Sequence, residues 1–281
     1  MLARVRFAPL ISVLLLSLTA ISLHAQHQDP HAQAIVHAAV QTELAADRDD
    51  HSRWQYRDLY RNPEGESLFH VVETDHGSVK KKLKYNGQPL TPDQLRAEDT
   101  RIQAFVQDPA LQARQRKDGE QDDKRAEEML RLLPDAFLWT LKSDTPDAIT
   151  LAFTPDPNFT PPSMEARVFA AMAGEIVVTK PQNRIQSLKG KLIRDVKFGY
   201  GLFGRMYQGG TFNVERRELA PRIWQITESH IHIDGHVLIF KNISEQEDDV
   251  KTDFRRTPPD TTLAQAATIL KAEPTALAAQ R

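Results

Sequence analysis

The chain has 281 residues, no cysteine and a formal net charge of −2. Without cysteine, neither a disulfide nor a lipid bound to an N-terminal cysteine is available to it. The near balance of acids and bases also argues against a nucleic-acid partner, which would favour a basic face. After an N-terminal segment, about 256 residues remain, enough to bury an apolar core as one domain.

The first 25 residues are typical of a secretory signal peptide. Arg4 and Arg6 precede an apolar run over residues 10–18, and small or polar residues lead to Ala25. The run is shorter than the ~20 residues of a membrane-spanning helix, although an uncleaved N-terminal anchor is the alternative. We therefore predict a cleaved chain that is periplasmic or secreted, is not a lipoprotein and has no membrane span after cleavage. Loss of the two arginines changes the net charge from −2 to −4.

The first part of the mature chain shows one helix signal and then strand signals. Apolar residues spaced three and four apart predict a helix over residues 32–46. Alternation of apolar and polar side chains then predicts strands, and Asp75-His76-Gly77 is a hairpin turn between two of them. The predicted strands are residues 54–60, 67–73 and 78–85.

Residues 91–134 are predicted to form a charged helical insertion. A capping box and a proline at the first helical position mark its start after Thr91. Asp108-Pro109 interrupts it, and Pro134 is expected to end it. Charges of both signs alternate over residues 114–128, which is typical of a solvated helix or a loop.

The second half changes to strands and short turns. A proline-rich passage leads to a helix over residues 163–172, and a last helix covers residues 261–270. Turns as short as Asp234-Gly235 require antiparallel pairing, because a parallel connection needs a dozen or more residues. The predicted strands are residues 137–142, 148–153, 175–179, 185–198, 205–208, 211–219, 224–233 and 236–240.

These strands have one apolar and one polar face. Leu192 and Val196 alternate with polar neighbours, and Phe212 and Val214 alternate with Asn213. The apolar side of such a sheet needs a cover, which the helices can supply. The predicted fold class is α+β, with a curved, open antiparallel β-sheet (a half-barrel) covered by several helices. Residues 26–281 are expected to form this single domain.

Two motifs suggest ligands but fail on geometry. Residues 199–204 read Gly-Tyr-Gly-Leu-Phe-Gly, a dinucleotide-binding string, but no helix follows to hold a pyrophosphate, so no cofactor is predicted. With a two-residue turn at Asp234-Gly235, His236 would lie on the opposite face from His230 and His232. We therefore predict no metal, although a site formed by His230 and His232 alone is the alternative.

No catalytic residue is assigned. The sequence has no Gly-x-Ser-x-Gly elbow, no His-Glu-x-x-His and no cysteine nucleophile. A glycosidase with paired carboxylates stays open, because such pairs leave little local trace in a sequence.

A resemblance covers Phe153 to Phe254. It rests on residues 153–159 (Phe-Thr-Pro-Asp-Pro-Asn-Phe), residues 172–178 (Met-Ala-Gly-Glu-Ile-Val-Val) and Gly209-Gly210-Thr211-Phe212. This stretch resembles uncharacterised exported proteins of acidobacterial type, and its layout is similar to periplasmic lipoprotein carriers of the Lol type and related lipid-binding half-barrels. The resemblance implies a hydrophobic cavity between an unclosed barrel and its helices. The insertion at 91–134 departs from that layout.

We therefore expect a non-enzymatic periplasmic carrier or binding protein for lipid, acyl chains or a lipoprotein. The alternatives are a secreted hydrolase and an envelope protein that binds a protein partner. The same apolar residues could also form an ordinary filled core. The residues predicted to line the cavity are Val196, Phe198, Tyr200, Phe212, Val214, Trp224 and Ile226, with Trp139 and Phe169.

Overall fold

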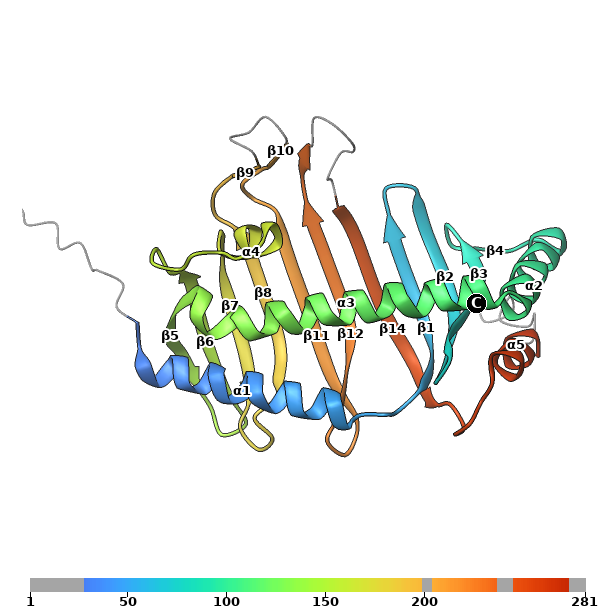
Figure 1. The fold of residues 1–281 in the computed structure, drawn as a ribbon, viewed down its shortest axis with the longest axis horizontal. Coiled ribbons are helices and arrows are strands. Elements are labelled where there is room, and N and C mark those ends of the chain that lie inside the picture. Colours follow the sequence, from blue (N-terminus) through green and yellow to red (C-terminus); the bar gives the residue numbers. More distant parts are fainter. Residues whose placement is uncertain (1–27, 199–203, 237–244, 273–281) are drawn as a thin grey trace, which may run out of the picture.

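The structure is a computed structural model that describes residues 28–198, 204–236 and 245–272. These residues form one open antiparallel sheet of 11 strands, a three-stranded sheet and five helices (Figure 1). The strand order of the large sheet is β4-β3-β2-β1-β14-β12-β11-β8-β7-β6-β5, and β4 and β5 are its two edges. The α+β class and the unclosed antiparallel sheet are confirmed.

The bounds of the elements follow the chain. The strands of the large sheet are β1 (Trp54–Asn62), β2 (Gly65–Thr74), β3 (Gly77–Tyr85), β4 (Gln88–Pro89), β5 (Phe137–Asp144), β6 (Ala148–Pro155), β7 (Met172–Thr179), β8 (Ile185–Leu192), β11 (Thr211–Ala220), β12 (Ile223–Ile233) and β14 (Glu245–Arg256). The small sheet contains β9 (Val196–Phe198), β10 (Gly204–Met206) and β13 (Gly235–His236). The helices are α1 (Pro30–Asp49), α2 (Pro92–Gln107), α3 (Pro109–Ala136), α4 (Met164–Phe169) and α5 (Leu263–Lys271).

Strand β14 joins the two halves of the large sheet. Its Val250 pairs with Leu59 of β1 on one side and with Glu228 of β12 on the other. This strand was not predicted from the sequence, because its residues are mostly charged and show no apolar alternation. The last part of the chain therefore lies at the centre of the sheet, which makes the sheet depend on pairings distant in sequence.

Two strand predictions were wrong. The strand expected over residues 185–198 ends at Leu192, because the Ile193 N–H donates to the Ala171 carbonyl and the Asp195 carboxylate accepts from the Gln208 N–H. The hairpin expected at Asp234-Gly235 does not form, since His236 pairs with Arg205 of β10 instead of returning along β12. Residues 237–240 of that predicted strand lie outside the described residues.

The helix starts agree with their sequence signals. The Thr91 capping box with Gln94 is present. After the break at Asp108-Pro109, α3 begins at Pro109 with Asp108 as its N-cap. Pro134 does not end α3, which continues to Ala136. A proline in the last turn costs the helix one hydrogen bond, because its missing N–H cannot donate to the preceding turn. The Pro134 carbonyl, near the helix end, accepts a hydrogen bond from the indole of Trp139 at 3.2 Å.

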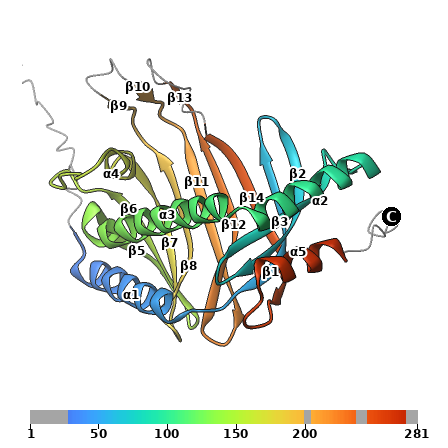
Figure 2. The same ribbon diagram turned by 45° about the vertical axis from the view of Figure 1, so that its right-hand side comes forward.

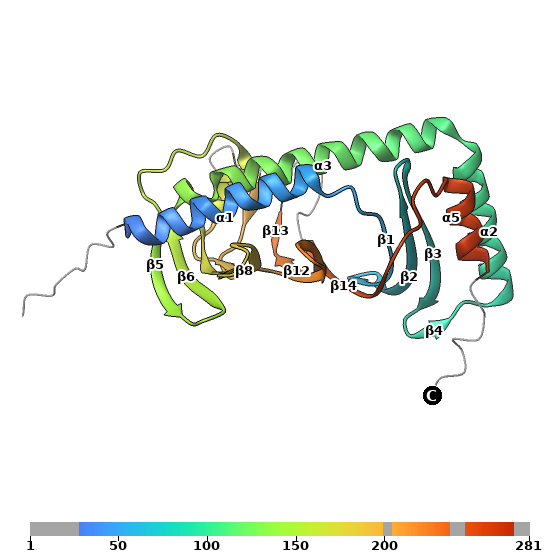
Figure 3. The same ribbon diagram turned by 90° about the horizontal axis from the view of Figure 1, so that it is seen from below.

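The helices pack on both faces of the sheet (Figure 3). We name the face toward α1 and α3 the inner face, and the other the outer face. On the inner face of β5–β8, side chains of α1 and the end of α3 form the main apolar core, which includes Val40, Leu133 and Ile176. At the other end of the sheet, α2 and α5 cover the outer face of β2 and β3 in a second cluster that includes Val72 and Leu270.

Helix α3 crosses the inner face from one end of the sheet to the other (Figures 1 and 2). Its last turns join the main core through Leu130 and Leu133, and near its start Gln115 bonds to the backbone of Ser78 in β3. Between these anchors, every residue from 116 to 128 is exposed. Ion pairs such as Arg114–Asp118 and Lys124–Glu128 join one turn to the next, as expected for a solvated helix.

The signal peptide predicted for residues 1–25 lies outside the described residues. Within the described part of the chain, no helix is both long enough and apolar enough to cross a membrane.

Candidate functional site

The middle of the inner face is not packed against α3. Since residues 116–128 of α3 are exposed all around the helix, no side chain of the sheet buries them. Strand register places Val214 of β11, Asp249 of β14 and Tyr60 of β1 in one row across this part of the sheet, and all three are only partly buried. The row is apolar at β11 and polar at β14 and β1.

The residues predicted to line a cavity do not form one group. Trp139 is fully buried in the main core, together with Val196, and Phe169 and Phe212 pack against that core. Val214 is partly buried on the inner face, whereas Ile226 is 43% exposed. These positions separate because β9 leaves the large sheet, so that the apolar alternation does not continue past Leu192.

Three further predicted residues lie apart from that core. Trp224 donates from its indole to Gln182 at 3.0 Å, and its ring lies 6.0 Å from the Arg184 guanidinium. Phe198 belongs to β9, where it pairs with Gly204. Tyr200 lies outside the described residues.

A cleft of about 1180 Å³ opens where the last turns of α1 meet two turns of the sheet. It lies at the turns of the β7–β8 and β11–β12 hairpins. Phe212 and Val214 belong to β11, the first strand of the second hairpin. Most of the residues that line it are polar or charged, and the full set is Gln41, Thr42, Ala45, Ala46, Asp49, Asp50, His51, Ser52, Pro181, Gln182, Arg184, Arg222, Ile223 and Arg256. Sequence reasoning missed it, because it combines four segments distant in sequence.

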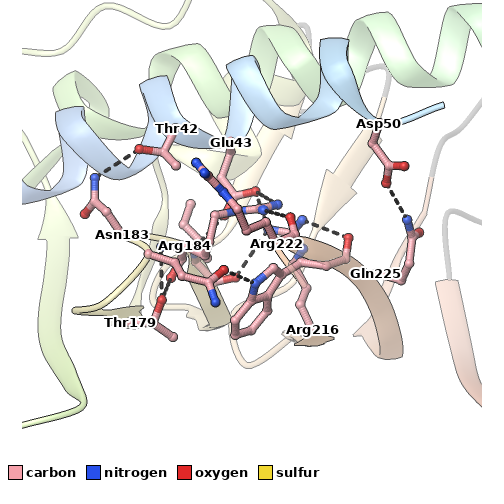
Figure 4. Close-up of polar contacts among 12 residues, drawn as sticks. Thr42, Glu43, Asp50, Thr179, Asn183, Arg184, Arg216, Arg222 and Gln225 are labelled. Carbon is pink, nitrogen blue, oxygen red and sulfur yellow. Dashed lines mark hydrogen bonds and ion pairs between the residues drawn. The ribbon is translucent and has the colours of Figure 1, made fainter. Parts of the chain in front are cut away.

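A buried charge network holds α1 beside this cleft (Figure 4). The Glu43 carboxylate accepts from Arg184 Nε at 3.0 Å and Nη2 at 2.9 Å, and from the Ile185 N–H at 2.7 Å. Arg216 Nη1 lies 2.6 Å from the same carboxylate. The side chains of Glu43 and Arg184 are only 5% and 6% exposed. Burial alone would raise the pKa of Glu43, but the hydrogen bonds and charges of the two arginines outweigh it and hold that pKa below its usual value.

This network contains one more positive than negative charge. Arg184 also donates to the Arg222 carbonyl at 2.9 Å, and Arg216 donates to the carbonyls of Ile185 and Trp224. A buried charge pair adds little net stability, but removal of one partner leaves the other uncompensated. The network therefore fixes the position of α1 on the sheet and leaves the wall of the cleft positively charged.

Elsewhere on the inner face, Asp58 of β1 and Asp249 of β14 form a carboxyl pair. Burial, and then the charge and hydrogen bond of Asp249, raise the pKa of Asp58 to about 7. Lys251 Nζ lies 3.5 Å from the Asp249 carboxylate and 5.6 Å from the centre of the Tyr56 ring. Such a pair can share a proton and can act as general acid and base. The carboxyls of a glycosidase stand about 5 Å or more apart, so this directly bonded pair differs from the paired carboxylates of that class.

The pKa values of two other acidic groups near this pair, on β1 and β2, are also raised. Burial raises the pKa of Glu73, whose carboxylate accepts from the Trp54 N–H at 3.0 Å. Burial and the charges of Glu73 and Asp58 raise the pKa of the Tyr56 hydroxyl, so that it stays protonated.

The histidines of β12 lie on the outer face. His230 Nδ1 is 2.6 Å and His232 Nε2 is 3.0 Å from one oxygen of Asp248, on β14. This acidic partner was missed because β14 was not predicted. His236 lies in the small sheet, paired with Arg205. Among the described residues, no group of three or more histidine, aspartate or glutamate side chains is arranged to hold a metal ion.

Comparisons with known proteins find no match among protein-family models, curated proteins or solved structures. The resemblance to Lol-type carriers and to acidobacterial exported proteins therefore stays a prediction from the sequence.

Proposed function

We propose that this protein is a non-catalytic binding protein that carries an amphiphilic ligand, the acyl chain of a lipid or lipoprotein, on the inner face beneath α3. With the signal peptide predicted at its N-terminus, it would work in the periplasm or outside the cell. The open sheet would then act as a half-barrel with α1 and α3 as its cover.

One observation carries this proposal. A helix that closes a filled core buries an apolar stripe, yet α3 buries nothing between residues 116 and 128 while it crosses the sheet. Helix propensity and ion pairs between successive turns maintain this span without a core contact. Because this span is exposed on every side, water reaches the side of the helix that faces the sheet, and this is the place that the proposal gives to the ligand.

The lining supports an amphiphilic ligand better than a purely apolar one. Phe212, Val214 and Ile231 offer apolar contact on β11 and β12, whereas Asp249 and Tyr60 make the neighbouring strands polar. Binding sites of this kind combine apolar walls with a few polar groups that orient the ligand.

Native mass spectrometry after gentle purification, together with titration of an uncharged apolar fluorophore such as N-phenylnaphthylamine, tests the proposal. We expect Val214→Glu to weaken fluorophore binding at least about tenfold, since it places a charge on the apolar side of the inner face. Val250→Glu is the matched control, because Val250 is also partly buried but lies on the outer face. Absence of both co-purified lipid and fluorophore binding would overturn the proposal.

The Asp58–Asp249 pair favours a second candidate, a hydrolase in which these carboxyls act as acid and base. A panel of glycoside and ester substrates tests it, with Asp58→Asn as the variant. Turnover that Asp58→Asn abolishes while the fold persists would establish the hydrolase. Turnover unchanged by Asp58→Asn would remove the pair from consideration.

A further inference from the structure

The cleft at the end of α1 has an unequal distribution of charge. Four arginines, Arg184, Arg216, Arg222 and Arg256, line it or belong to the network beside it, together with four carboxylates, Glu43, Asp49, Asp50 and Glu218. The acidic groups Asp49 and Asp50 belong to the end of α1, whereas the arginines come from the sheet. The wall formed by the sheet is therefore basic.

Two of these arginines are available to a ligand. Neither Arg222 nor Arg256 forms an ion pair with any residue that the structure describes, and both side chains are exposed at the cleft. The Arg256 guanidinium lies 4.4 Å from the centre of the Trp54 ring, which orients it without neutralising its charge. Guanidinium groups bind carboxylate and phosphate with two parallel hydrogen bonds.

Carboxylates at the cleft already accept hydrogen bonds from other groups of the protein. The Asp50 carboxylate accepts from the Ser52 N–H at 2.8 Å and from the Gln225 side-chain amide at 3.0 Å. The Glu43 carboxylate is surrounded by Arg184, Arg216 and the Ile185 N–H. The Glu218 carboxylate accepts from the Arg222 N–H at 2.6 Å and from the Gln182 side-chain amide at 2.9 Å. Asp49 is exposed to water, which weakens its field at Arg222 and Arg256.

The cleft is also close to the apolar part of the inner face. Val214 and Arg216 are two residues apart on β11, or about 7 Å at the rise of a strand. Arg216 contacts Glu43, and Glu43 contacts Arg184, which lines the cleft. The cleft and the apolar part of the inner face are therefore neighbouring regions of the same sheet.

We propose that this cleft binds the anionic head group, a carboxylate or a phosphate, of the amphiphile whose chain lies on the inner face; this inference rests on the proposed function. Arg222 and Arg256 would contact the anion directly. Arg184 and Arg216 would contribute the excess positive charge of the buried network behind them.

Binding of four ligands with the same twelve-carbon chain tests the head-group preference: dodecanoate, dodecyl phosphate, dodecanol and dodecyltrimethylammonium. Calorimetry should find the two anions bound at least about tenfold more tightly than dodecanol, and the cation more weakly than dodecanol. In the double variant Arg222→Gln, Arg256→Gln, the preference for the anions over dodecanol should fall below about threefold. Arg255→Gln is the matched control, since Arg255 is an exposed neighbour on β14 that does not line the cleft.

The outcomes separate the two proposals. Equal binding of dodecanol and the anions, or an anion preference that survives the double variant, would overturn the head-group site and leave the carrier proposal standing. Failure of all four ligands to bind would overturn the carrier proposal itself. Inorganic phosphate that binds as tightly as dodecyl phosphate would show that the cleft takes a free anion, which also contradicts the head-group assignment.

Discussion

The side chain of Gln115 in α3 pairs with the backbone of Ser78 in β3 as a neighbouring strand would. Its carbonyl oxygen accepts from the Ser78 N–H at 3.1 Å, and its amide donates to the Ser78 carbonyl at 3.1 Å. The residues are 37 positions apart in the chain. This contact anchors one end of the helix that crosses the inner face, and the main core anchors the other.

Gln115→Ala should therefore loosen α3 without unfolding the sheet. We expect amide hydrogen exchange over residues 110–128 to accelerate, while the free energy of unfolding falls by about 1 kcal/mol for the exposed pair of hydrogen bonds. Gln121→Ala, in the exposed span of the same helix, is the control and should leave exchange nearly unchanged. Equal exchange rates in the two variants would contradict the anchoring role.

Glu43→Ala should be strongly destabilising. It leaves Arg184 and Arg216 buried beside each other without a counter-charge, and removal of one partner from a buried pair costs about 3–5 kcal/mol. Urea denaturation measures this, with the exposed Arg48→Gln on the same helix as the control. A loss no larger than that of the control would show that α1 does not depend on the network.

The network also predicts a dependence on pH. Because the folded state lowers the pKa of Glu43 below its unfolded value of 4.5, its contribution is present above that pH and is lost as the pH falls through the folded pKa. Denaturation between pH 6 and pH 3 should show this loss, and Glu43→Gln should reduce the slope.

The carboxyl pair on β1 and β14 predicts the opposite dependence. The pKa of Asp58 is raised from 3.8 to about 7, so the folded state binds a proton more tightly than the unfolded state. Stability should therefore be greatest below pH 4 for this group and should decline as the pH rises to 7. Because water partly reaches the pair, we expect the free energy of unfolding to fall by about 1–2 kcal/mol over this range, which is less than the full pKa shift would give.

The variant Asp58→Asn isolates that effect. It should remove most of the decline between pH 4 and pH 8 and should stabilise the protein at pH 8, as measured by thermal denaturation at each pH. Glu73, whose pKa is also raised by burial, should account for the slope that persists. Destabilisation of Asp58→Asn at pH 8 would contradict the assignment.

Two glycines should respond to alanine in opposite directions. At Gly190 a Cβ would lie 2.2 Å from the Phe212 ring, so Gly190→Ala must displace that ring and should cost about 1–3 kcal/mol. At Gly119, within the exposed span of α3, a Cβ would meet nothing within 4 Å. Gly119→Ala should therefore stabilise the helix by about 0.5–1 kcal/mol. Melting temperatures of the two variants would show whether the signs differ.

Local sequence signals predicted the helix starts and most strands. The capping box at Thr91, the break at Pro109 and the alternation over residues 211–219 act within a few residues, and the structure contains each of these features. A solvated helix or loop was also predicted for the charged span of α3, because charges of both signs alternate along it. Pro134 did not mark the end of α3 as expected, since a proline in the last turn removes only one hydrogen bond of the helix.

The sequence alone determined the α+β class, the antiparallel pairing and the charged helix, because periodicity, turn length and capping are properties of neighbouring residues. Only the tertiary structure decided where β14 lies, which aligned Asp58 with Asp249 and His230 with Asp248. It also decided that Glu43 meets Arg184 and Arg216, 141 positions or more along the chain. Such contacts depend on which strands pair and on where a helix packs against the sheet. Local patterns in the sequence predict neither of these.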